Sequence, residues 1–148
     1  MPLARCWFAT RRTTAAARID LQLILNRSKP ATLWAVLDEV VLHRRVGSEE
    51  IMQRQLAHLL EQGERPHIGI QVVPARSGAN AGHVGGFTIA SVEGAADVLL
   101  RNSVEDVTTD QCALLLKAHA IFDRVRSEAL PRTESLELIA KVAEQCKV

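Results

Sequence analysis

The sequence predicts a single α+β domain in which helices pack on a four-stranded, partly antiparallel sheet. Amphipathic stripes with helical spacing alternate with short apolar runs, and their order along the chain is α-β-α-β-β-β-α-α. A length of 148 residues suits one domain, and no repeat or linker interrupts it. Aromatic residues make up only 3% of the chain, so the core must consist mainly of Leu, Ile, Val and Ala.

The segment before residue 40 predicts one helix and one strand. Residues 13–26 favour a helix because three alanines lead into an apolar face, and Pro30 disfavours helix at the residue before it. Residues 32–37 form a short apolar run that is typical of a buried strand. Asp38 and Glu39 stand where this strand ends, and ligand sites often lie at strand ends in folds of this kind.

The second helix is predicted between Ser48 and Gly63. Residues 40–46 leave two alternatives open, since they either extend the strand or turn through a basic corner to Gly47. Ser48 is expected to be an N-cap, followed by two glutamates that face the positive end of the helix dipole. An apolar stripe at i, i+4, i+7 and i+8 starts at Met52.

Three further strands follow. Residues 68–72 alternate between apolar and small or polar side chains, and Pro74 ends this strand. Residues 76–86 read as a loop that contains Gly, Ser and Asn. Residues 87–92 and 97–101 predict two strands of a hairpin, because a Glu-Gly step separates them.

Two helices close the chain. Thr108 and Gln111 have capping-box spacing and predict the start of a helix over residues 110–128, which Pro131 ends. Residues 134–145 predict the last helix. The stripe on the longer helix consists of Cys112, Leu115, Leu116, His119, Phe122 and Val125. We therefore expect Cys112 to lie in the core and His119 in the core or at its boundary.

Composition and charge exclude several classes of protein. The net charge of +1 lacks the basic footprint of a dedicated nucleic-acid binder, so we expect no direct DNA binding. Basic residues gather only near the start, and we predict a flexible basic segment at 1–12 before a domain at 13–148. Three scattered cysteines indicate neither a zinc site nor a disulfide framework, which favours the cytoplasm. No apolar run is long enough to span a membrane.

No catalytic motif, metal-ligand spacing or phosphate-binding loop is recognisable, and we predict neither a metal nor a cofactor. Asp38 and Glu39 would point to opposite faces of a strand, so one of them is expected to pair with Arg44 or Arg45. His83 lies in the glycine-rich loop, where it could carry a proton. If the protein is an enzyme, the catalytic candidates are Glu39, His83 and Asp38, and Arg101 is a further candidate.

An ordered set of residues resembles one known family. The matching positions are Arg18, Gln22, Leu37, Asp38, Glu39, Leu42, Val46, Gly47, Met52, Gln55, Leu56, Leu59, Leu60, Val72, Val73, Pro74, Gly78, Gly82, Phe87, Thr88, Phe122, Asp123, Ala129, Leu130 and Ser135. From about residue 18 to residue 139 the chain resembles the domain of unknown function that follows the DNA-binding domain in actinobacterial helix-turn-helix regulators of the xenobiotic-response-element type. One departure is Arg101-Asn102, where the family tends to place an acidic residue.

The resemblance implies a regulatory sensor or effector domain that binds a small molecule or a protein partner. The segment before the domain is too short for a helix-turn-helix, so we expect DNA to be read elsewhere. Two alternatives stay open, a stand-alone isomerase or cyclase of a biosynthetic pathway, and a homodimeric interaction module. The predicted ligand-binding residues are Glu39, Arg44, His83, Phe87 and Arg101.

Overall fold

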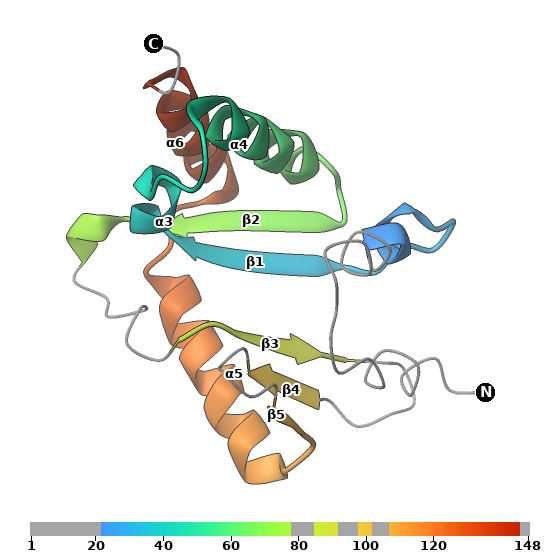
Figure 1. Ribbon diagram of the computed structural model, residues 1–148. Coiled ribbons are helices and arrows are strands. Elements are labelled where there is room, and N and C mark those ends of the chain that lie inside the picture. The colour runs from blue at the N-terminus through green and yellow to red at the C-terminus, as the bar shows by residue number, and fades with distance from the viewer. Residues whose placement is uncertain (1–21, 78–84, 92–97, 102–106, 146–148) are drawn as a thin grey trace. The chain divides into compact units, whose positions relative to one another are not determined.

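The computed structural model describes residues 22–77, 85–91, 98–101 and 107–145, and it confirms the α+β class (Figure 1). The residues group into two compact units. The larger unit contains residues 32–84 and 122–148, and the smaller unit contains residues 1–31 and 85–121. Helix α5 (Cys112–Ser127) contributes residues to both units.

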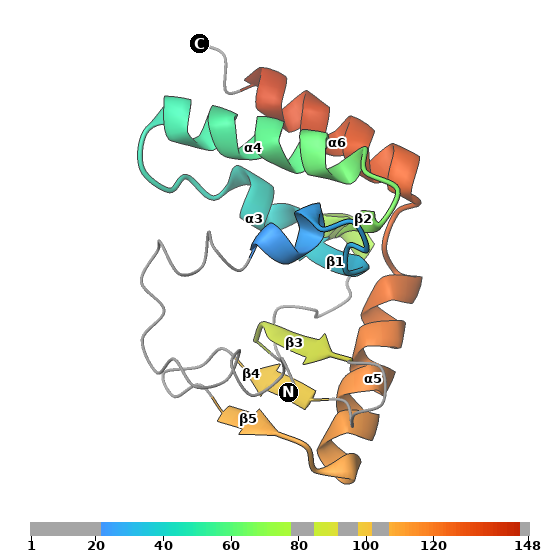
Figure 2. The same cartoon turned by 90° about the vertical axis from the view of Figure 1, so that its right-hand side faces the viewer.

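The larger unit is built on a parallel strand pair. Strand β1 (Leu33–Asp38) pairs in parallel with β2 (Ile68–Val73), and a parallel pair needs a crossover connection. Helices α3 (Glu39–His43) and α4 (Glu49–Gly63) form that crossover, and α6 (Arg132–Gln145) follows later in the chain. In both views α4 and α6 run side by side over one face of the strand pair (Figure 2).

The core of the larger unit lies between this helix pair and β2. Leu56 from α4 and Ile139 from α6 are almost completely buried. Both faces of β2 are buried along most of its length, which is typical of a parallel strand. The prediction of strands at residues 32–37 and 68–72 and of the helices α4 and α6 is confirmed.

The corner after β1 differs from both sequence-based alternatives. Residues 40–46 neither extend the strand nor form only a turn, because Glu39–His43 is a short helix. The Asp38 carboxylate accepts a hydrogen bond of 2.9 Å from the backbone N–H of Val40 and so caps this helix. Glu39 is therefore helical, and the strand-based argument that it points away from Asp38 does not apply.

The predicted N-cap of α4 is confirmed. The Ser48 side chain accepts from the backbone N–H of Ile51, and Glu49 and Glu50 occupy the first turn. The Ser48 hydroxyl, and after it the backbone N–H of Glu50, lower the pKa of the Glu50 carboxyl from 4.5. A lowered pKa means that ionised Glu50 favours the folded helix above about pH 4.5, and this contribution is lost as the pH falls through the folded-state pKa.

Replacing Ser48 with alanine is expected to lower the free energy of unfolding by about 1 kcal/mol, because the start of α4 loses its side-chain acceptor. The pKa of Glu50 should rise towards 4.5 at the same time, since its largest cause of depression is gone. Urea unfolding and carboxyl NMR titration measure the two effects. Ser48→Asn is the matched control, because asparagine caps helices about as well as serine.

The segment between α5 and α6 covers the edge of β2 that faces away from β1. The backbone N–H of Leu130 donates to the Val72 carbonyl at 2.9 Å, and the Val72 N–H donates to the Ser135 hydroxyl at 3.0 Å. The guanidinium of Arg132 donates to the Gly63 carbonyl, which ties α6 to the end of α4. Both backbone polar groups of Val72 are therefore satisfied at this edge of β2.

The smaller unit contains an antiparallel sheet. Strands β3 (Phe87–Ala90), β4 (Val98–Arg101) and β5 (Val107–Thr109) pair in that order, so the predicted hairpin is confirmed. Phe87 and Ile89 pack against Leu115 and Ala118 of α5. The predicted four-stranded sheet is not confirmed, because the described strands form one parallel pair and one three-stranded sheet.

Several predictions for this unit were wrong in detail. Strand β5 was not predicted, and Thr108 lies in it rather than at the start of a helix. The hydroxyl of Thr109 instead accepts from the backbone N–H of Gln111, and α5 begins one residue later. Cys112 and His119 are exposed, since the buried face of α5 in this unit runs through Leu115 and Ala118.

Of the first predicted helix, the structure describes only Gln22–Asn26, which form a 3₁₀ helix named η1. The predicted basic segment 1–12 and most of the loop at 76–86 lie outside the described residues, although Ala75–Ser77 form a second 3₁₀ turn, η2. Among the helices that the structure describes, none is both long and apolar enough to cross a membrane.

Candidate functional site

A cavity of about 190 Å³ lies in the larger unit, where α3, the start of α4 and the end of α6 meet. Three buried apolar side chains, those of Leu42, Met52 and Val142, line it. Its polar lining comes from His43, Arg45, Glu49 and Gln145, all of which are exposed residues. The cavity therefore combines an apolar floor of buried side chains with a charged rim, a combination that is common in small-molecule sites.

Local chain geometry explains why these segments converge. Leu42 is the one buried residue of α3, and α3 contacts α6. Gly47 then has a φ of 75°, a left-handed conformation that glycine adopts without a steric penalty, and it sits close to Ile51. This turn redirects the chain into α4, so that Met52 and Leu42 reach the same cavity from consecutive helices.

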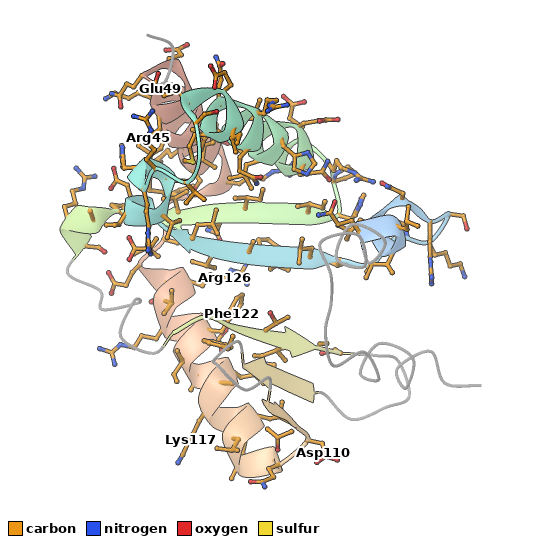
Figure 3. The ribbon with its side chains drawn as sticks, viewed as in Figure 1. Arg45, Glu49, Asp110, Lys117, Phe122 and Arg126 are labelled. Atoms are coloured by element: carbon orange, nitrogen blue, oxygen red, sulfur yellow. The ribbon has the colours of Figure 1, made fainter. Side chains whose placement is uncertain are left out.

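An ion pair crosses part of the rim. Arg45 Nη1 lies 3.2 Å from Glu49 Oε1, and the two side chains remain 64% and 50% exposed (Figure 3). Such exposed pairs contribute little to stability because water screens them and ordering two long side chains costs entropy. A ligand can therefore replace one partner at small cost. His43 Nε2 lies 3.9 Å from Glu39 Oε1, at the outer limit of an ion pair.

The predicted acidic residues have structural contacts next to this cavity. Glu39 Oε2 accepts a hydrogen bond of 2.8 Å from the backbone N–H of Ala75, which joins α3 to η2. Asp38 caps α3. The expected ion pair of one of these two residues with Arg44 or Arg45 is not among the contacts of the described residues. The ion-pair partner of Arg45 is Glu49. Arg44 ends α3, is exposed, and is not part of the cavity lining.

The remaining predicted residues belong to the smaller unit or lie outside the described part of the chain. Phe87 is half-buried in the antiparallel sheet, and its backbone is in register with that of Arg101 on β4. His83 lies outside the described residues. The structure thus places Glu39 at the start of α3 and Arg44 just after its end, and it places Phe87 and Arg101 in one strand pair.

Sequence reasoning missed Arg45, Glu49 and Gln145 as rim residues. Arg45 and Glu49 are four residues apart, but Arg45 lies before the N-cap Ser48 and outside any helix, so the rule for helical ion pairs did not point to their contact. Nothing local to Gln145 indicates that it lies near them. Among the residues that the structure describes, no three His, Cys, Asp or Glu side chains are grouped in a way that could hold a metal ion.

Comparison with known proteins gives a family and no closer relative. Searches of curated proteins and of solved structures gave no match. A family model described as "Domain of unknown function (DUF5753)" matches residues 9–141, which is most of the chain. The matched range includes α3, α4 and β2 and ends within α6. The chain therefore belongs to the DUF5753 family.

Proposed function

We propose that this protein is a regulatory sensor or effector domain, and that the cavity between α3, α4 and α6 binds a small molecule. The observation that carries this proposal is the pairing of a buried apolar floor with an exposed ion pair at the rim. The family resemblance supports it, because the similar domains follow the helix-turn-helix of actinobacterial regulators of the xenobiotic-response-element type.

The contacts of the acidic residues favour binding over catalysis. Asp38 and Glu39 each accept a hydrogen bond from a backbone N–H, so both carboxylates hold the fold around α3. The rim residues Arg45 and Glu49 are exposed and opposite in charge, which suits recognition of a polar group on a ligand. In this proposal a cytoplasmic helix-turn-helix, in the same or a neighbouring protein, reads DNA.

Ligand binding in the cavity can be tested by placing a bulky side chain at its entrance. Gln145→Trp is expected to abolish binding of small amphipathic fragments, because Gln145 lines the cavity and an indole there can occupy it. Gln145 is exposed, so the substitution should leave the core and the unfolding midpoint unchanged. Glu144→Trp is the matched control, since Glu144 is exposed on the same helix and does not line the cavity. Ligand-observed NMR with a fragment set measures binding.

The proposal fails if no fragment binds the unaltered chain saturably, or if both tryptophan variants bind the same fragments as the unaltered chain does. A second check uses DNA. Fluorescence anisotropy with labelled duplex should show only weak, salt-sensitive association, because the net charge of the chain is +1. Specific, salt-resistant binding of one operator by this chain would contradict the proposal that a separate helix-turn-helix reads DNA.

A further inference from the structure

We infer that the cavity takes a small aliphatic carboxylate, whose chain lies on Leu42, Met52 and Val142 and whose carboxylate binds Arg45. This inference rests on the proposed function, since it names the chemical class of the ligand for the same cavity.

The apolar floor sets the size of the ligand. A dry cavity of about 150 Å³ holds benzene, so a volume of about 190 Å³ accommodates roughly eight non-hydrogen atoms. Leu42 and Val142 are rigidly placed by burial, whereas Met52 is unbranched and can adapt its shape to a flexible chain. An unbranched acid of about six carbons therefore matches the floor better than a large aromatic ligand.

The rim selects the charge of the ligand. A guanidinium has five N–H donors, more than the one carboxylate of Glu49 can engage, so the exposed Arg45 side chain has donors for a second carboxylate. The amide of Gln145 and the imidazole of His43 add further donors to the lining. Glu49 is the one acidic residue in the lining, and it lies in the first turn of α4.

The number of donors in the lining, and not the ion pair alone, favours an acid over an amine. A ligand ammonium at Glu49 would be repelled by Arg45, as a ligand carboxylate at Arg45 is by Glu49, but Arg45, His43 and Gln145 offer more hydrogen-bond donors than Glu49 offers acceptors. A ligand carboxylate meets Glu49 as a competitor, and the exposed Arg45 side chain can turn from one carboxylate to the other. The expected order of affinity is therefore acid, then alcohol, then amine.

Three probes with six-carbon chains test this order: hexanoate, hexan-1-ol and hexylamine. The dissociation constants are measured by amide NMR titration of the full chain at constant ionic strength. Hexanoate is expected to bind about fivefold more tightly than hexan-1-ol, a modest factor because the contact is exposed. Arg45→Gln should abolish this preference, so that hexanoate binds no more tightly than hexan-1-ol.

Two further variants sharpen the test. Arg44→Gln makes the same charge change one residue away and outside the cavity lining, so it should leave hexanoate binding within about twofold. Glu49→Gln removes the competing carboxylate and should tighten hexanoate binding by about twofold to fivefold. A general charge effect would instead make the Arg44 and Arg45 variants behave alike, and this would overturn the inference.

The outcomes separate the inference from the proposed function. If fragments bind in a manner that Gln145→Trp blocks, while hexylamine binds as tightly as hexanoate, the carboxylate assignment is wrong and cavity binding stands. The same conclusion follows if Arg45→Gln leaves hexanoate binding unchanged. If no fragment and none of the three probes binds at the cavity, both the carboxylate assignment and the proposed function fail.

Discussion

Replacing Leu56 with alanine is expected to lower the free energy of unfolding by about 2–5 kcal/mol. Leu56 is 1% exposed and lies on the face of α4 that packs on α6 and β2. Truncation removes buried methyl groups and leaves a cavity that three packed elements cannot close without moving. The loss should appear in urea unfolding as a lower midpoint with an unchanged slope.

Ile51→Ala is the control for this prediction. Ile51 lies on the same helix and is 48% exposed, so its truncation should cost less than about 1 kcal/mol. The core assignment would be wrong if the two substitutions had equal effects. Because Leu56 does not line the cavity, this test concerns the packing of α4 and not ligand binding.

Ser135→Ala is expected to lower the free energy of unfolding by about 1–3 kcal/mol, a large effect for the loss of one oxygen atom. Ser135 is 0% exposed, and its hydroxyl accepts from the Val72 N–H and donates to the Leu130 carbonyl at 3.1 Å. Alanine leaves the buried N–H of Val72 on β2 without this acceptor. The penalty is the desolvation of a polar group that can no longer bind water.

Amide hydrogen exchange tests the mechanism as well as the size of this effect. Exchange at Val72 should accelerate in Ser135→Ala by more than the change in global stability explains, because the hydrogen bond itself is lost. The control is Ser127→Ala, since the exposed Ser127 hydroxyl donates to a helix carbonyl. Its loss should lower the free energy of unfolding by less than about 0.5 kcal/mol. Equal effects of the two substitutions would argue against a structural role for Ser135.

Long periodic segments were predictable from the sequence. The stripe of α4 and its Ser48 cap are local features, and the structure reproduces both. The short elements were not predictable, because tertiary contacts decide them. Helix α3 has five residues, two of them valine, and so it has little intrinsic helical stability. It forms because Asp38 caps it and Leu42 is buried in the unit where α3 contacts α6.

The buried face of a helix was harder to predict than the helix itself. Apolar residues surround the first half of α5, so several stripes are consistent with the sequence, and the predicted stripe placed Cys112 and Leu116 in the core although both are exposed. The observed core of the smaller unit uses Leu115 and Ala118 because Phe87 and Ile89 of β3 pack there. The strand that packs on α5 thus determines which face of the helix is buried. The sequence of the helix alone does not indicate where that strand lies.

The cavity could not be predicted from the local sequence either. Its lining joins a corner near Leu42 with the last turn of α6, two segments that lie far apart in the chain. The sequence indicated a polar cluster at this corner and named Arg44 as a ligand-binding residue. The structure instead gives Arg45 to the cavity lining, because α3 ends at His43 and in the extended segment that follows Arg45 is the residue that contacts Glu49.

The most direct test of small-molecule binding in the cavity is a two-dimensional amide NMR titration of the isotope-labelled chain with hexanoate. Saturable shifts are expected for Leu42 and Met52 and along the last turn of α6 near Val142, with an affinity in the high micromolar to low millimolar range for so small a ligand. Gln145→Trp should remove these shifts. Shifts that never saturate, or that instead cluster around Phe87 in the three-stranded sheet, would contradict the assignment of this cavity as the binding site.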